Sequence, residues 1–375
     1  MKHKAAALVV VFTLGFFAAI AAAQTVGEIV YLEEGVGISR NGNRLDPQLV
    51  HIGAGIENLD LLRTDPTGYA EVELDPRGGA GAMLRVSPNT TFAFELNRSG
   101  RESRSTVGLI TGSLAVKVQK LSGGQSLQVA TEAALMGVRG TTFEVLVTAA
   151  GEVLVSADEG RVSCVDDQGR ELFAEPGQVV EKLPGESFRA IPVAVSSLEE
   201  FRRDWYAERL EVFKANPLKA VRQYALRYLE LRERFARSYG ALEGEREVLR
   251  KWYDEDRRGR VGSRMETMRE NKRIVGRLLD LRKTLFVFER VYFRLDELQQ
   301  YFEEGYGRGE VRPGLSAAGF FELFDRDRET LAGQMAEVRY ITKLYALRNQ
   351  GRFPTDRFEE GEAEFFGDED EDFSF

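Results

Sequence analysis

One stretch of ten residues decides the fold that we expect for the first half of the chain: Met136-Gly137-Val138-Arg139-Gly140-Thr141-Thr142-Phe143-Glu144-Val145. Gly137 and Gly140 frame Val138 and Arg139, and this spacing indicates a sharply bent or bulged strand where only glycine tolerates the backbone. Arg139 then points inward, as a fork onto a carboxylate such as Asp60 or Glu144, or outward toward a ligand. We favour the inward, structural role. Arg63 has the same two alternatives and the same preference.

Short runs of alternating apolar residues surround this stretch, from residue 24 to about residue 195. Leu114–Val118 and Phe143–Val147 are two of them, and period-two runs bounded by Gly, Asn, Asp and Pro are typical of β-strands. Turn signals such as Arg40–Asn43 and Glu175–Gly177 recur at short intervals, so we expect roughly a dozen strands. This density predicts an all-β domain over residues 24–195, as a β-sandwich or a β-solenoid.

Several blocks of this half resemble the FecR domain family in the order in which they occur. The stretch 136–145 resembles the family signature, a G-V-R-G-T-x-F-x-V run, with Gly137, Val138, Arg139, Gly140, Thr141 and Phe143 at its defined positions. The other blocks are the opening strand Val26–Val30, the turn Asp60-x-x-Arg63-Thr64, and the segments Pro88–Thr90, Gly112–Leu114 and Glu175–Gln178. The resemblance covers about residues 26 to 182. It departs from the family pattern at Leu59, where the family has glycine, and at Pro76–Gly81, where an acidic turn is usual.

The resemblance implies a periplasmic sensing or protein-interaction role. The best-known family members are transmembrane regulators that receive a signal from an outer-membrane transporter and control a sigma factor. Here the first apolar segment begins at residue 5, so we expect no cytoplasmic domain ahead of it and no complete circuit within this chain. The sequence is more similar to the stand-alone exported members, in which the domain is a module fused to other parts.

The apolar period lengthens to three and four residues after Ile191–Val193, which predicts a helical domain over residues 196–350. Ser196 or Ser197 is a candidate helix cap, and Asn216-Pro217 has the pattern of an N-cap followed by proline at the first helical position. Residues 263–302 predict one helix of roughly 60 Å. We expect long helices packed as a bundle or an antiparallel coiled coil, with residues 305–316 as the turn into the last one. Three apolar stripes carry this prediction: Val221, Ala225, Tyr228, Arg232, Phe235 and Tyr239; Leu278, Leu281, Leu285, Phe288, Tyr292 and Leu295; and Leu331, Met335, Val338, Thr342 and Tyr345.

The two ends of the chain have their own character. Residues 1–23 have the charged start, apolar run and Ala21–Ala23 end of a secretory signal peptide, which we prefer to an uncleaved anchor. We therefore expect a periplasmic or secreted protein. Residues 351–375 form an acidic tail that we expect to be disordered. Its phenylalanines are candidate anchors for a partner groove: Phe358, Phe365, Phe366, Phe373 and Phe375.

Charge and cysteine content restrict the classes of partner. The formal net charge is −9, and loss of Lys2 and Lys4 with the signal peptide would make it −11. An acidic chain repels nucleic-acid phosphates and anionic lipid headgroups, so we expect neither as a general partner, and no membrane span after cleavage. Cys164 is the sole cysteine, which excludes an intramolecular disulfide, and we expect it to be a buried strand residue.

The residues needed for common catalytic sites are scarce. His51 is the only histidine beyond the signal segment and has no nucleophile motif nearby, so a metal site of the His or Cys type and a Ser-His-Asp triad are both disfavoured. Asp158-Glu159 precedes Gly160 between two strand-like runs, so we interpret it as a hairpin turn rather than a glycosidase pair. We expect no cofactor, no metal and no catalytic residue.

These observations predict a non-catalytic envelope scaffold whose β domain binds a protein or a cell-wall glycan, and whose helices space or oligomerise it. The alternatives are a sensor component of an envelope signalling system and, less favoured, a wall or polysaccharide hydrolase.

Overall fold

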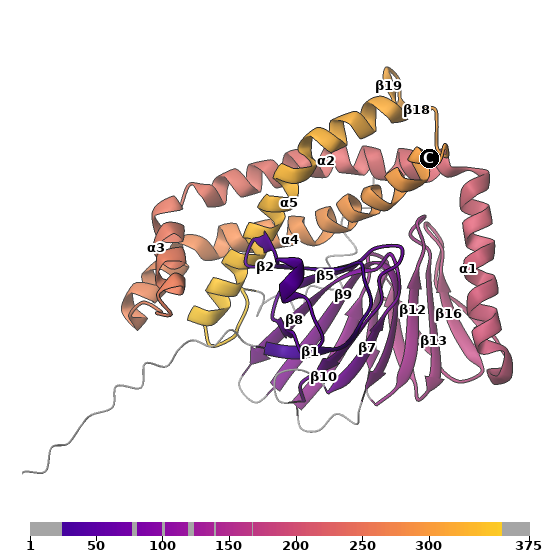
Figure 1. The fold of residues 1–375 in the computed structure, drawn as a ribbon, viewed down its shortest axis with the longest axis horizontal. Helices are drawn as coiled ribbons and strands as arrows, with labels where there is room; N and C mark the ends of the chain where they lie inside the picture. The colour runs from indigo at the N-terminus through magenta and orange to yellow at the C-terminus, as the bar shows by residue number, and fades with distance from the viewer. Residues whose placement is uncertain are drawn as a thin grey trace, which may run out of the picture.

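The computed structural model describes residues 25–76, 81–99, 102–118, 124–138, 140–166 and 168–354. A β-rich part extends from Thr25 to Pro192 and a helical part from Leu198 to Arg348 (Figure 1). The signal-peptide prediction for residues 1–23 lies outside the described residues. So does the tail from residue 355 onward.

Two sheets make up the β-rich part, and the long strand β9 (Glu102–Val118) belongs to both. Along the first sheet the strands are β4 (Gly55–Glu57), β1 (Thr25–Leu32), β6 (Ala70–Leu74), β7 (Ala82–Val86), the second half of β9, β12 (Thr142–Val147), β13 (Val153–Glu159), β16 (Gln178–Lys182) and β17 (Arg189–Pro192). Along the second they are β3 (Asn43–Arg44), β2 (Val36–Arg40), β5 (Leu61–Thr64), β8 (Thr91–Ser99), the first half of β9, β10 (Gly124–Ala130), β11 (Ala134–Val138), β14 (Val162–Asp166) and β15 (Glu171–Ala174).

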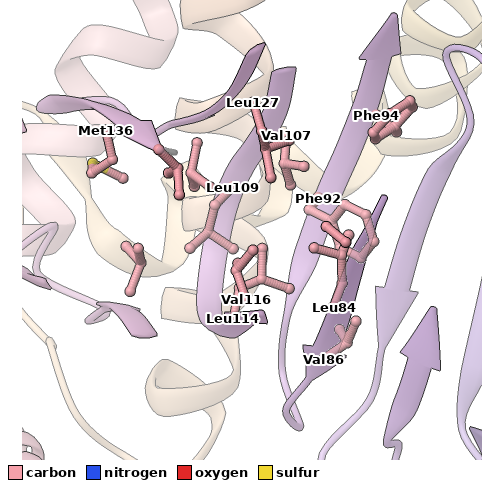
Figure 2. Packing of buried hydrophobic residues seen from close by; sticks show 14 of the residues in the cluster. Leu84, Val86, Phe92, Phe94, Val107, Leu109, Leu114, Val116, Leu127 and Met136 are labelled. Carbon is pink, nitrogen blue, oxygen red and sulfur yellow. The ribbon is translucent and has the colours of Figure 1, made fainter. Parts of the chain in front are cut away.

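One apolar core fills the space between the two sheets (Figure 2). Strand β7 shows how the sequence produces it: Ala82, Leu84 and Val86 are buried, while Met83 and Arg85 between them are not. Neighbouring strands are antiparallel apart from β9 and β10. The coils of a solenoid would instead stack in parallel, so the structure corresponds to the sandwich alternative. The described β-rich part has 17 strands rather than roughly a dozen, because very short strands such as β3 and β4 leave no alternating pattern.

The second core lies among five α-helices: α1 (Leu198–Ala215), α2 (Pro217–Glu243), α3 (Arg246–Arg257), α4 (Arg264–Glu303) and α5 (Ala317–Arg348). All members of the three predicted stripes are buried except Arg232, which confirms the long-helix bundle. Coiled-coil geometry stays a prediction. The sequence did not predict the separate helix α3 or the hairpin β18 (Glu310–Arg312) and β19 (Leu315–Ser316) in the turn before α5.

Helix α1 is attached to the end of the sandwich, beside β13 and β16 (Figure 1). A third, small apolar cluster holds it there, with Leu154 and Val179 from the sheet and Leu198 and Trp205 from the helix. Ser197 and Asn216 occupy the N-cap positions of α1 and α2, yet neither side chain makes a capping hydrogen bond. No helix within the described ranges has the length and apolar character to cross a bilayer.

Candidate functional site

The signature stretch forms the passage from the second sheet to the first. Gly137 and Val138 end β11, and Thr142 begins β12. Arg139 lies outside the described residues, so its inward or outward direction stays a prediction. Gly140 has a φ of +68°, where glycine is favoured. Gly137 has no such φ, and a Cβ there would meet only Ser163 Cβ at 3.9 Å, so the expectation of a glycine-only backbone at this position is wrong.

Tight packing surrounds the second half of the signature. The backbone N–H of Val118 donates to the carbonyl oxygen of Thr141 at 2.9 Å, and Phe143 is fully buried in the sandwich core. A Cβ on Gly160, in the turn after β13, would lie 2.6 Å from Thr141 Cγ2. The described signature residues therefore form a structural corner and line no open site.

Three further family blocks meet at one point. Thr64 Oγ1 donates to the carbonyl of Ser87 at 2.7 Å and accepts the N–H of Thr90 at 2.8 Å. Thr90 Oγ1 in turn accepts the N–H of Ser113 at 3.0 Å. Segments that are distant in the sequence thus share a buried hydroxyl network, and the threonine positions are fixed by these bonds.

The carboxylates proposed as partners of Arg139 are engaged by other arginines. Arg40 forks onto Asp60, with nitrogen-to-oxygen distances of 2.6 to 3.1 Å, and the N–H of Glu57 adds a bond of 2.8 Å to Asp60. Burial raises the pKa of Asp60 although Arg40 acts in the opposite direction. Glu144 accepts a hydrogen bond from Ser113 Oγ at 2.9 Å and lies 3.4 Å from the guanidinium of Arg202 in α1.

Arg63 connects the β domain to the helices. Its guanidinium pairs with Asp296 of α4, a carboxylate that is almost fully buried and also contacts Arg328 of α5. Arg63 thus pairs with a carboxylate, as the favoured structural role has it, but the partner lies 233 residues further along the chain and not within the β domain. The outward, ligand-facing alternative is replaced by this contact.

Further contacts beside Arg63 come from a row of arginines on α4 that face the second sheet. We call this contact region the domain junction. Arg282 Nη2 donates to both carboxylate oxygens of Glu95 in β8, at 2.8 Å each. Arg290 and Arg294 reach the carbonyl oxygens of Ala130 and Ile110 at 3.5 and 3.3 Å. Residues spaced by multiples of four lie on one helix face. The opposite face of α4 carries the predicted apolar stripe, so the helix is packed on both sides.

Residues of α2 extend the domain junction. Arg227 Nη1 lies 2.7 Å from Glu132 Oε1, in the turn after β10, and Tyr224 donates a weaker hydrogen bond of 3.4 Å to the same carboxylate. None of these residues could be predicted from the sequence, because single charged residues on a helix give no signal that distinguishes a docking contact from a solvated one.

Burial makes the domain junction electrostatically costly. It lowers the pKa of Arg290 to about 10, and Nε of both Arg290 and Arg294 is buried without a hydrogen-bond partner. An unsatisfied buried donor costs on the order of 1–3 kcal/mol, more when it is charged. The junction thus positions the two domains through buried charged groups whose desolvation cost is only partly offset by hydrogen bonds and ion pairs. An apolar core carries no such cost.

The metal-ligating and titratable side chains that the sequence singled out lie apart from one another in the described residues. Within the described ranges, no three His, Cys, Asp or Glu side chains are grouped to hold a metal ion. His51 is exposed with Nδ1 2.9 Å from the carbonyl oxygen of Ile52, and Asp158 is paired with Arg202 at 2.8 Å. Cys164 is buried in β14, as predicted, and burial raises its pKa to about 12. An open hollow of about 570 Å³ runs along α3 and holds only charged side chains: Glu247, Arg250, Lys251, Asp254, Glu255 and Arg258.

Two solved structures show a distant likeness to part of this chain. Two crystal structures of a protein from Parabacteroides distasonis ATCC 8503, described as a candidate anti-sigma factor, share 15% identity with this chain at a TM-score of 0.32. The alignments cover 38% and 37% of this chain but 63% and 62% of theirs, so the chain spans under two thirds of their length. No curated protein matches the sequence.

The comparison with protein families gives a direct match. The family model described as FecR protein matches residues 60–163, from the Asp60 turn through the signature to β14. The opening strand at Val26–Val30 and the turn at Glu175–Gln178 lie outside the matched range, so their assignment to the family stays a prediction. Residues 60–163 of the chain therefore match the FecR family.

Proposed function

We propose that this protein is a non-catalytic sensor component of an envelope signalling system, in which the FecR domain receives a signal and the helical domain relays it. The family match favours this function over the passive scaffold that the sequence suggested first. We further propose that residues 1–23 direct export, so that the FecR domain works in the periplasm or outside the cell.

The observation that carries the proposal is the contact between Arg63 and Asp296. Arg63 belongs to the Asp60-x-x-Arg63-Thr64 block, and the next residue, Thr64, bonds to the Thr90 turn. A ligand that displaced this block would therefore move the partner of a buried carboxylate on α4. Because Asp296 also contacts Arg328 of α5, the displacement would reach two helices.

The composition of the domain junction supports a relay. Each domain has its own apolar core, and charged groups link the two at the junction. Contacts between domains that are polar and only partly compensated permit relative motion more readily than an apolar interface does. A ligand that binds one relative position of the two domains modestly better than another would then shift the population of molecules toward that position.

The experiment compares transcripts from four strains under envelope stress: the parent, a deletion, a junction variant Asp296→Asn and a matched control Asp327→Asn. Asp327 pairs with Arg232 inside the helical part at 2.9 Å and lies outside the domain junction. We expect the deletion and Asp296→Asn to alter the same set of transcripts, while Asp327→Asn does not. Immunoblots establish that the variants accumulate to the level of the parent.

An unchanged transcriptome in the deletion strain would refute the sensor and leave the scaffold. A purified double-mutant cycle with Arg63→Gln and Asp296→Asn tests the contact itself. We expect a coupling energy of about 1–3 kcal/mol, as for other close pairs in one ion-pair network.

A further inference from the structure

The far end of the helical part has an unusual surface, which we call the helical tip and define as residues 257–273. It contains the end of α3, the connecting loop and the first turns of α4, and it lies away from the end of the sandwich where α1 packs (Figure 1). Seven basic and two acidic residues fall in this segment, in a chain whose formal net charge is −9. The helical tip is thus a local positive surface on an acidic protein.

Large apolar side chains are exposed among these charges. Met265 and Met268 are 68% and 64% exposed, and Val261 in the loop is 44% exposed. The helical period places both methionines on the same face of α4 as Arg269 and Lys272. Exposed methionines within a group of charges are typical of a surface that binds a partner, since their flexible side chains adapt to apolar groups.

Most basic side chains of the helical tip form no ion pair within the described residues. Five of them are exposed and form no ion pair with any residue in the described ranges: Arg258, Arg260, Arg264, Arg269 and Lys272. Capping bonds between Ser263 and Glu266 hold this end of α4 in place. The tip therefore presents fixed positive charge and apolar surface together.

One segment of this chain has the complementary composition. Residues 355–375 contain ten acidic residues, one arginine and the five phenylalanines singled out in the sequence. The chain approaches this segment beside α4, because Asn271 donates to Asn349 at 2.8 Å and Arg348 pairs with Glu255 at 2.7 Å. Phe353 is buried, with the guanidinium of Arg282 4.7 Å above its ring.

The remaining segment is long enough to reach the helical tip. Along α4, residue 282 lies roughly 21 Å from residue 268 at 1.5 Å per residue. The eleven residues from 355 to 365 span up to roughly 36 Å when extended. Phe365 and the acids that follow it can therefore reach Met268, and a segment tethered this closely has an effective concentration in the millimolar range.

We propose that the acidic, phenylalanine-bearing segment 355–375 docks on the helical tip of its own chain. Phe365 and Phe366 cover Met265 and Met268, while the acids from Asp368 to Asp372 meet Arg264, Arg269 and Lys272. Charge and apolar character match on both sides, which a polyanion without apolar groups would satisfy only in part. This contact is additional to the sensor function and independent of it.

Methionine oxidation tests the contact in the full-length protein. Dilute hydrogen peroxide converts accessible methionine to the sulfoxide, and mass spectrometry follows Met265 and Met268 separately. The tail variant carries Phe365→Ser and Phe366→Ser with Asp368, Glu369, Asp370, Glu371 and Asp372 changed to their amides. We expect both methionines to oxidise roughly fivefold faster in it, since a segment docked about four fifths of the time leaves them open for the rest.

The matched control removes five exposed acids from α1 instead: Glu199, Glu200, Asp204, Glu208 and Glu211. It changes the net charge equally and should leave the rates at Met265 and Met268 unchanged. A charge swap makes the test specific. Changing Arg264, Arg269 and Lys272 to glutamate should abolish the protection of the two methionines from oxidation. Changing the five tail acids to lysine in that background should restore this protection.

Equal oxidation rates in the natural chain and the tail variant would overturn the proposal. Failure of the charge swap to restore protection would also overturn it, because direct pairing requires that rescue. Protection that arose only after addition of phosphatidylglycerol vesicles would assign the helical tip to a lipid surface and exclude the tail.

Discussion

At Gly112, strand β9 turns from the second sheet into the first with a φ of +90°. A Cβ on this residue would lie 2.3 Å from Thr90 Oγ1 and 2.6 Å from Thr90 Cα, so neither the backbone conformation nor the space admits a side chain. We expect Gly112→Ala to destabilise the fold by about 2–4 kcal/mol, measured by urea unfolding.

Gly137→Ala is the control for this prediction. Gly137 is also a strand residue in a family block, but it has an ordinary strand φ and room for a Cβ. Alanine there should be neutral or stabilise by up to about 1 kcal/mol, because it loses less backbone entropy on folding. Equal losses at both positions would contradict our account of Gly112.

Glu297 provides a test of electrostatics at the domain junction. Burial raises its pKa, and Arg294 at 2.7 Å offsets this only in part. A carboxyl whose pKa is higher in the folded state stabilises the fold below its unfolded pKa, and this contribution is lost as the pH rises through the folded pKa. Glu297→Gln cannot ionise, so its stability relative to the natural chain should improve as the pH rises from about 4 to about 7.

Glu266 has a pKa shift of the opposite sign, and its variant serves as the control for that experiment. Hydrogen bonds from Ser263 lower its pKa, so its contribution is present above the unfolded pKa and is lost as the pH falls. Glu266→Gln should therefore lose stability relative to the natural chain as the pH rises over the same range. Urea midpoints at several pH values measure both trends, and identical trends would refute the assignment.

Among the elements, α4 decides how the molecule is assembled, since one face packs in the helical core and the other on the second sheet. Its start is defined by a capping box, in which Ser263 and Glu266 exchange hydrogen bonds. Ser263→Ala should cost about 1 kcal/mol in urea unfolding. Ser197→Ala at the start of α1 should cost much less, because the Ser197 side chain makes no capping bond.

The apolar face of α4 could be predicted from the sequence, and its charged face could not. Leu278, Leu281 and Leu285 recur with the helical period, and that pattern is sufficient to predict a buried stripe. Arg282, Arg290 and Arg294 obey the same period but bind groups in distant strands, and a single sequence does not say which strands approach them. The strands of the FecR domain were predictable by alternation, whereas the contact of Arg63 with Asp296 depends on tertiary packing alone.

On the scale of the whole molecule, the two tryptophans report on different regions. Trp252 lies in the helical core, while Trp205 is held between α1 and the first sheet, where it donates to Glu181 at 2.6 Å. The two large apolar cores are separate, and only the small cluster at α1 joins the sandwich to the helices by apolar contact. We therefore expect urea to unfold the regions around Trp205 and Trp252 at different concentrations. Fluorescence of the single-tryptophan variants Trp205→Phe and Trp252→Phe measures the two midpoints.

A single shared midpoint for both variants would show that the junction couples the domains into one cooperative unit. The arginine contacts would then stabilise the junction more than their partial compensation indicates. Charge neutralisation by Arg282→Gln serves as the check, since it should split the shared midpoint into two if the junction is what joins the domains.

Strand β9 has a mechanical consequence. Because a single strand carries hydrogen bonds in both sheets, the two layers cannot slide past each other without breaking its ladder on one side. The FecR domain should therefore respond to a pull or a push as a stiff block. Bending of the protein under load should then fall on the contacts between the two domains, the arginine row of α4 among them.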